Sequence, residues 1–268
     1  MTSDPAALLA AYDDQLREAN ELSTARDVQR HGPLWWGVFR DTYGFCTYRD
    51  LAGAEGPALD ALIEATVAHF RDDTDVSSFE WKSRGHDAPE DLGDHLRAHG
   101  LVAEDRETVM IGEAQLLAVD VAVPDEVTIR RAGEGGDLVS DVERASAMQD
   151  AVFGQPSGMT NEALLESLTA EPRLVELWLA EAGGQVVSAG RIDVVPGTDF
   201  AGIWGGATLA PWRGRGIYRA LTAARARSAL ALGVRYINSD SSDMSRPILE
   251  RSGLLPVTTT TPYVWTRP

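Results

Sequence analysis

The segment of this sequence best suited to chemistry is Arg213-Gly214-Arg215-Gly216-Ile217-Tyr218. Glycines allow the backbone to approach a ligand closely. The first N–H groups of a helix have no partner within the helix and bind anions, assisted by the helix dipole. A strand over residues 203–208, this turn and a helix from about Gly216 therefore predict a pyrophosphate site. Its backbone would run from Gly214 to Arg219, and Arg213 and Arg215 would add positive charge.

The distribution of charge indicates an anion site at the same place. The chain has a net charge of −17, and residues 1–124 hold 10 Lys and Arg against 24 Asp and Glu. Between Asp199 and Asp240 there is no acidic residue, yet this window contains six arginines. An arginine-rich helix face would by itself explain such a window. Together with the glycines, the window favours an anion-binding site.

The second half of the chain reads as a mixture of strands and helices. Strands are expected at 127–131, 174–181, 185–194, 200–209, 234–240 and 258–265, and helices at 138–151, 161–168, 216–232 and 245–252. The strands on either side of Ala182-Gly183-Gly184 form a hairpin, and a turn-rich loop at 154–158 joins the first two helices. Hairpins combined with one β-α-β crossover predict an α/β (α+β) fold with a mixed, mostly antiparallel sheet flanked by helices.

The first half resembles a worn copy of the end of the second half. It predicts helices at 3–19, 57–70 and 90–99 and strands at 39–48, 79–82 and 108–112. The run from Leu96 to Val102 echoes the run from Leu249 to Leu255, and each follows a strand and a longer helix. We therefore expect a degenerate domain at 1–124 and a complete one at 125–268. Because Glu55 precedes the first copy's helix, only the second copy should bind an anion.

The stretch from Ala207 to Leu221 resembles the acetyl-CoA signature of the GNAT (GCN5-related N-acetyltransferase) superfamily, Gln/Arg-x-x-Gly-x-Gly/Ala at the start of a helix. Arg213 and Gly216 match this signature, and Tyr218 departs from it at the small-residue position. Residues 245–254 resemble the short helix that the family places before its last strands, and the strand order from Val127 also fits. The resemblance covers about half of the chain and implies a GNAT-like acyltransferase domain with a partial N-terminal copy.

The resemblance also implies where acetyl-CoA would bind. In that family the strand before the motif separates from its neighbour, and pantetheine pairs with exposed backbone groups, which here would be those of Gly206, Ala207 and Thr208. The pyrophosphate would lie on Gly214 to Arg219. A backbone N–H polarises the acyl carbonyl, an amine attacks, and the thiolate leaves. No metal is part of this chemistry.

Two departures from the family pattern leave the catalytic acid and base open. A tyrosine often found in the short helix is Leu249 here, and an asparagine after the fifth strand is Ser242. All five histidines lie in the first half, so the second half has no imidazole base. The candidate catalytic residues are Asp240 and Asp243, which would hold the amine or take its proton, and Tyr218, which would protonate the sulfur. Alternatives for the acid are water, Tyr263 and Ser245, and Glu181 is a further carboxylate.

Composition argues against several other classes of protein. The net charge is unsuited to nucleic acid, and no apolar run approaches the roughly 18–20 residues of a membrane span. Cys46 is the only cysteine, which excludes an internal disulfide. His95 and His99 have the spacing of metal ligands but lack the glutamate of a His-Glu-x-x-His motif. We expect a cytoplasmic protein without a metal. A homodimer is possible, and the sequence does not decide the oligomeric state.

The expected activity is transfer of an acetyl group from acetyl-CoA to a primary amine of a small molecule or peptide. The alternative is a catalytically weak acyl-CoA-binding regulatory module, of which Leu249 would be a sign. A dinucleotide-binding Rossmann domain fits less well, because hairpins before the motif do not suit a parallel sheet.

Overall fold

The computed structural model describes residues 4–39, 43–154 and 159–268, so the loop predicted at 154–158 lies, apart from Gly154, outside the described residues. The chain forms two compact units. The C-terminal unit comprises residues 111–239 and 247–255. The N-terminal unit comprises the chain up to residue 110 together with residues 240–246 and 256–268. The division predicted after residue 124 falls within the C-terminal unit.

The C-terminal unit is built on neighbouring strands in the order β11-β10-β9-β8-β7. Strands β7 (Val127–Arg131), β8 (Val175–Ala182), β9 (Gln185–Val194) and β10 (Phe200–Thr208) pair antiparallel. Strand β11 (Tyr236–Ser241) pairs parallel with β10, but only from Phe200 opposite Tyr236 to Gly202 opposite Asn238. Strand β10 therefore continues for six residues beyond its register with β11.

Helices cover both faces of this sheet. On β8, Leu177 and Leu179 share a core with α5 (Leu138–Phe153) and α6 (Asn161–Thr169), whereas Ala180 and Ala182 share one with α7 (Ile217–Ala231). Alternate residues of a strand point to opposite faces, so α7 lies on the face opposite α5 and α6. Buried Ile217 and Leu221 fix the first turns of α7 against the sheet. The unit also contains α4 (Ala114–Leu117), the 3-10 turn η3 (Ala210–Trp212) and most of α8 (Arg246–Ser252).

The N-terminal unit contains the strand order β1-β2-β3-β4-β12. Its strands are β1 (Asp27–His31), β2 (Leu34–Val38), β3 (Tyr43–Thr47), β4 (Ser78–Arg84), the short β5 (Val102–Ala103) and β12 (Leu255–Thr266), and β6 (Glu107–Glu113) begins in it. Strands β3 and β4 are parallel and are joined by α2 (Pro57–Ala68) and the π-helical turn η2 (His69–Asp73). The chain's last strand, β12, pairs antiparallel with β4. The β1–β2 hairpin was not predicted from the sequence.

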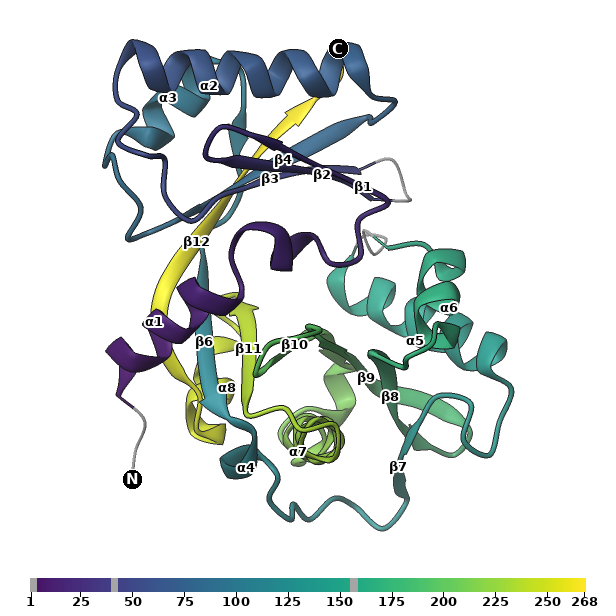
Figure 1. Ribbon diagram of the computed structural model, residues 1–268. Helices are drawn as coiled ribbons and strands as arrows, with labels where there is room; N and C mark the ends of the chain where they lie inside the picture. The colour runs from purple at the N-terminus through teal and green to yellow at the C-terminus, as the bar shows by residue number, and fades with distance from the viewer. Residues whose placement is uncertain (1–3, 40–42, 155–158) are drawn as a thin grey trace. The chain divides into compact units, whose positions relative to one another are not determined.

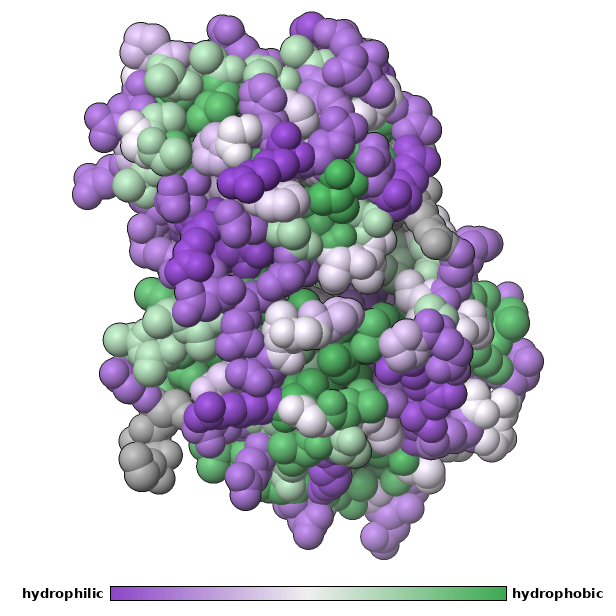
Figure 2. Space-filling view, in the orientation of Figure 1, coloured by the Kyte–Doolittle hydropathy of each residue, from purple (hydrophilic) through white to green (hydrophobic). Residues whose placement is uncertain are grey.

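The two faces of this second sheet differ in character. Phe79 and Trp81 of β4 lie in the apolar core, which α2 and α3 (Leu92–Ala98) cover from one side (Figure 1). Glu80, Lys82 and Arg84 alternate with them and face the other side, where α1 (Pro5–Gln15) and the 3-10 turn η1 (Glu18–Leu22) supply polar partners. In the view of Figure 2, hydrophilic residues dominate the N-terminal unit, whereas apolar residues gather in patches on the C-terminal unit.

The predicted α/β fold class is confirmed. Strands and helices follow the same order in the two halves, β3-α2-β4-α3-β5 and β10-α7-β11-α8-β12. In both, the two strands that flank the longer helix are parallel neighbours. Predicted and observed bounds of α7 differ by one residue at each end, and α1 is capped as expected, because the Asp4 carboxylate accepts from Ala6 N.

Candidate functional site

Two glycines shape the turn between β10 and α7. Gly214 has φ +75° and would have nothing within 4 Å of a Cβ atom, so its backbone faces open space. Gly216 has φ +80° at the N-cap of α7, and a Cβ there would lie 2.8 Å from Ala122 O. Only glycine adopts these conformations readily. The turn therefore exposes backbone at Gly214 and packs tightly at Gly216.

The N-terminus of α7 has backbone N–H groups and a charge distribution that suit an anion. Its first intrahelical bond runs from Ala220 N to Gly216 O (2.9 Å), so the N–H groups of residues 217–219 precede the helical ladder. No acidic residue occupies the first turn. Arg215 lies over the Trp212 ring (4.9 Å), is half-exposed and contacts Glu126 only at 3.8 Å. Arg213 Nε donates to Thr208 O (2.9 Å), which fixes the turn against the end of β10. The sequence-predicted residues from Arg213 to Arg219 thus meet around one helix end.

Strand β10 is irregular where it leaves β11. Its register with β9 shifts between Trp204 and Ala207, and Gly205 has φ +60°. Ala207 and Thr208 then pair with β9 again, and Ser188 Oγ bonds both Ala207 O (2.6 Å) and Thr208 Oγ1 (2.8 Å). Beyond the register with β11, side chains bond two carbonyl groups of β10, since Ile203 O accepts from Ser239 Oγ (3.1 Å) and Thr208 O accepts from Arg213 Nε (2.9 Å). Gly206, Ala207 and Thr208, predicted to pair with pantetheine, lie along this stretch.

Asn238 lies at the point where the β10–β11 register ends. Its side chain is buried, and its Oδ1 has no hydrogen-bond partner among the described residues. A buried acceptor without a donor is costly, by about 1–3 kcal/mol. A ligand carrying amide N–H groups would satisfy this oxygen. The sequence analysis did not single out Asn238.

Tyr218 connects the turn to a buried cation. A Cβ at Gly206 would lie 2.8 Å from the Tyr218 ring, so the glycine makes room for the tyrosine. Burial lowers the pKa of the Arg225 guanidinium, and the nearby Tyr218 hydroxyl opposes this effect. Arg225 donates to Arg191 O (3.1 Å) and to Thr222 Oγ1 (3.1 Å). The structure therefore places the Tyr218 side chain between Gly206 of β10 and the Arg225 guanidinium.

Asp240 is held in an ion pair. Its Oδ2 lies 2.6 Å from the ammonium of Lys82, the only lysine in the chain, and Lys82 also lies 3.3 Å from Glu21. The Asp240 side chain is 7% exposed, and its Oδ1 has no hydrogen-bond partner within the described ranges. Burial opposes the charge on Lys82, but Asp240 and Glu21 outweigh it and raise the pKa of the lysine. Asp240 is thus a carboxylate whose Oδ2 is fixed by Lys82 and whose Oδ1 can accept a further hydrogen bond.

The other acid and base candidates occupy different settings. Asp243 is exposed in the turn before α8. Glu181 pairs with Arg130 (2.6 Å) and Arg144 (2.7 Å), which gives it a structural role. Leu249 is fully buried. Tyr263 is buried in the core of the N-terminal unit, where its hydroxyl accepts from Arg97, and Ser245 bonds Ser242.

Sequence reasoning gave no role to a cluster of charged residues on β4 and its surroundings. The cluster comprises Glu80, Lys82 and Arg84 of β4 and Glu107 of β6. Burial raises the pKa of Glu107 to about 7, and the charges of Asp240 and Glu80 contribute to the rise, which Lys82 opposes. A signal was present, because three charged residues alternate with Phe79 and Trp81 in a strand. Such alternation predicts one apolar and one polar face for the strand, and it does not distinguish a polar face in solvent from one that is paired.

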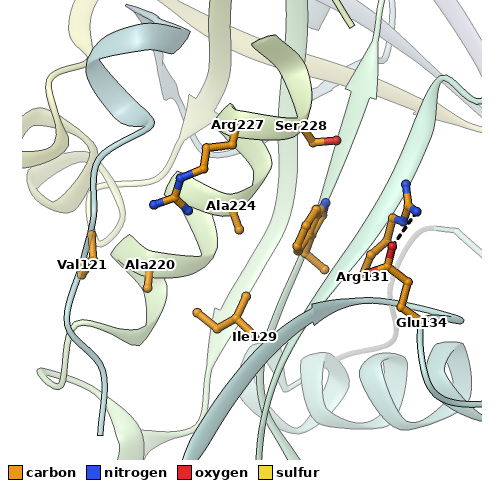
Figure 3. A pocket seen from close by; sticks show the side chains of 9 residues that line it. Val121, Ile129, Arg131, Glu134, Ala220, Ala224, Arg227 and Ser228 are labelled. Carbon is orange, nitrogen blue, oxygen red and sulfur yellow. Dashed lines mark hydrogen bonds and ion pairs between the residues drawn. The ribbon is translucent and has the colours of Figure 1, made fainter. Parts of the chain in front are cut away.

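A cavity of about 480 Å³ lies elsewhere in the C-terminal unit, between α7 and strands β7 and β8 (Figure 3). Ile129, Trp178 and Ala224 line it, and Arg131 and Arg227 stand at its rim. Both arginines have carboxylate partners, since Arg131 pairs with Glu134 (2.6 Å) and Arg227 with Asp120 (3.0 Å). The glycine turn does not line this cavity, so the cavity is separate from the anion site.

No metal-binding group of three or more His, Cys, Asp or Glu occurs among residues 4–39, 43–154 and 159–268. His95 and His99 instead both bond Asp60 Oδ1, at 2.7 and 3.0 Å. Within the same ranges, no helix is long and apolar enough to cross a membrane.

Comparison with known proteins identifies the fold. No family model matches the sequence, and no curated protein matches it significantly. The structure is similar to a GCN5-related N-acetyltransferase from Kribbella flavida (TM-score 0.63, 17% identity, 98% of this chain and 96% of that one). It is also similar to one from Sphaerobacter thermophilus (TM-score 0.63, 19% identity, 88% and 78%). A tandem GNAT protein from the clavulanic acid biosynthesis pathway matches with TM-score 0.57 and 12% identity over 99% and 97%. The chain therefore has a GNAT-like fold over nearly its whole length.

Proposed function

We propose that this protein is an acyl-CoA-dependent N-acyltransferase, which moves an acetyl group from acetyl-CoA to a primary amine of a small molecule or peptide. The observation that carries the proposal is the combination of two features in the C-terminal unit. An acid-free helix N-terminus follows an open glycine at position 214, and β10 leaves β11 directly before it. The GNAT-like fold supports the same chemistry.

The residues present fit acetyl-CoA as co-substrate. The N–H groups from Gly214 to Arg219 would hold its pyrophosphate, with Arg213 and Arg215 nearby. The backbone of Gly206 to Thr208 would pair with pantetheine, and Asn238 Oδ1 is a ready acceptor for one of its amide N–H groups. Bound acetyl-CoA supplies an activated acyl thioester.

The chain's own residues then position the acceptor and manage its protons. Asp240, fixed by Lys82, offers Oδ1 to the acceptor's ammonium, and Asp243 is the second candidate for this role. Tyr218 donates a proton toward the departing sulfur. A thiol near pKa 8.5, the value for cysteine, leaves readily even with weak assistance, so Leu249 is compatible with turnover. The acidity of the chain favours a cationic acceptor and disfavours nucleic acid as a partner. The proposed reaction takes place in the cytoplasm and uses neither a metal nor a membrane.

Two measurements test this function. Calorimetry should show CoA binding, and a free-thiol assay with a library of primary amines should show amine-dependent thiol release from acetyl-CoA. CoA binding without any amine-dependent release would favour the alternative, a regulatory acyl-CoA-binding module. Absence of CoA binding would refute both.

A further inference from the structure

The walls of the cavity between α7 and strands β7 and β8 are fixed by one buried carboxylate. Glu176 of β8 is 4% exposed and accepts a bond from Arg131 of β7 (2.8 Å). It also accepts from Trp178 Nε1 of its own strand (2.9 Å) and from Ser228 Oγ of α7 (2.6 Å). All three donors line the cavity. Because one carboxylate holds residues from three elements, the walls are in place before any ligand arrives.

The interior of the cavity is apolar. Ala220 and Ala224, one turn apart on α7, present only methyl groups to it, and Val121 and Ile129 add aliphatic surface. Trp178 supplies an aromatic ring whose polar atom, Nε1, is already bonded. Every lining residue belongs to the C-terminal unit. A volume of about 480 Å³ and this lining are typical of a site for a small apolar or aromatic molecule.

Two arginines give the rim positive charge that is loosely compensated. Arg131 and Arg227 lie on opposite sides of the cavity (Figure 3). Arg131 is shared between buried Glu176 and Glu134, which is 53% exposed. Arg227 pairs with Asp120, which is fully exposed. Because exposed ion pairs contribute little to stability, a ligand carboxylate can replace Asp120 at small cost.

We propose that this cavity binds a small aromatic carboxylate. The ring of the ligand lies against Trp178 and the two alanines of α7, and its carboxylate pairs with Arg227 in place of Asp120. The glycine turn does not line the cavity, so this is a second ligand site of the C-terminal unit. The inference goes beyond the proposed acyltransferase function and does not depend on it.

Binding is tested by calorimetry on the whole protein, with naphthoate as the probe. One naphthoate should bind per chain. Neutral naphthalenemethanol should bind about tenfold more weakly, because it lacks the charge that Arg227 recognises, and naphthylmethylammonium should bind more weakly still. Absence of saturable naphthoate binding, or an affinity for naphthoate that does not exceed those of the other two probes, would overturn the site.

Two variants test whether the probe occupies this cavity. Ala224→Leu fills space beside Trp178 and should weaken naphthoate binding about tenfold or more, whereas Ala231→Leu, at an exposed position of the same helix, should not. Arg227→Gln should weaken naphthoate binding about tenfold and leave naphthalenemethanol unchanged. Arg251→Gln, at an exposed arginine of the same unit, is the control for charge. Arg227→Gln changes an exposed side chain, so it decides the question even where Ala224→Leu disturbs packing. Unchanged naphthoate affinity in Arg227→Gln would contradict the proposal.

A competition experiment distinguishes this site from the glycine turn. Saturating CoA should change the affinity for naphthoate less than about threefold, because the two sites share no lining residue. Full competition would show that naphthoate occupies the anion site and would overturn a separate cavity site. Failure of CoA to bind at all would refute the acyltransferase proposal and leave the naphthoate site to be decided by its own variants.

Discussion

The chain contains two parallel β-α-β crossovers that share one backbone plan and differ in what they can bind. In the C-terminal unit, the turn before α7 carries Gly214 and two arginines, and the first turn of α7 has no acid. In the N-terminal unit, the turn before α2 carries Glu55, Pro57 removes one N–H from the first turn, and Asp60 adds a negative charge there. The plan is repeated, but of these two helices α7 has no acid in its first turn, whereas α2 has one.

Strands β3 and β10, which precede these two helices, differ in how far they pair with the strand that follows the helix. Strand β3 stays in register with β4 from Tyr43 to Cys46, over nearly its whole length. Strand β10 keeps register with β11 for three residues and then continues for six more. A strand without a partner along one edge offers backbone groups to a ligand. The copy that we propose to bind CoA therefore has an open strand pair, and the copy that we propose not to bind it has a closed one.

The largest expected effect comes from placing a negative charge in the turn before α7. Gly214→Glu should weaken CoA binding roughly 100-fold or more, because a carboxylate would lie where phosphate binds. Gly216 is left unchanged, since a side chain there would meet Ala122 O. Gly233→Glu is the matched control, because Gly233 follows the other end of α7 with φ +81° and equally open surroundings. Calorimetry with CoA should show a loss for Gly214→Glu alone; similar affinities for the two variants would contradict the anion site.

Asp240, near the end of β11, and Asp243, just after this strand, should differ in their effects. Asp240→Asn should lower kcat/KM for the acceptor by about 100-fold, whereas exposed Asp243→Asn should lower it by less than about threefold. The affinity for acetyl-CoA should remain nearly unchanged in both variants. Steady-state thiol release and calorimetry provide the measurements. A larger loss in Asp243→Asn than in Asp240→Asn would reverse the assignment.

A smaller effect is expected on stability. Glu107 loses its proton near pH 4.5 in the unfolded chain and near pH 7 in the folded protein. Between these values the folded state binds more protons, so this group makes stability fall as the pH rises. Glu107→Gln should remove that contribution and gain stability relative to the wild type from pH 5 to pH 8. Urea unfolding across this range measures the difference, and a constant difference between the two proteins would rule out the raised pKa.

Substitution of Glu55 in the turn before α2 should not change the number of CoA molecules bound per chain. Glu55→Gln removes the acid that faces the turn, but Pro57, Asp60 and the closed β3–β4 register remain. The variant should bind one CoA per chain, as the wild type should. A second binding event in calorimetry would show that charge alone distinguishes the two copies.

The extent of sequence-based prediction differed between backbone and side chains. Hydrophobic periodicity and glycine positions predicted α7 to within a residue and the strands of the second half in their observed order, because these depend on local patterns. In the first half, the β1–β2 hairpin and the short β5 were missed. The pairing of β12 with β4 could not be predicted, since partners far apart in the sequence leave no local signal. The ion pair between Asp240 and Lys82 was missed for the same reason, because 158 residues separate them. The acid-free arginine window predicts an anion site, which stays a prediction. Nothing in the sequence showed that Asn238 and Asp240 each have a buried oxygen without a partner among the described residues.

Hydrogen exchange with and without CoA tests most directly whether only one of the two crossovers binds the cofactor. Amide exchange should slow in peptides that cover residues 206–220, which include the end of β10, the glycine turn and the start of α7. Peptides that cover residues 48–62, the corresponding turn and the start of α2, should exchange at the same rate in both conditions. Protection of residues 48–62, or no protection of residues 206–220 at saturating CoA, would contradict the assignment of the anion site.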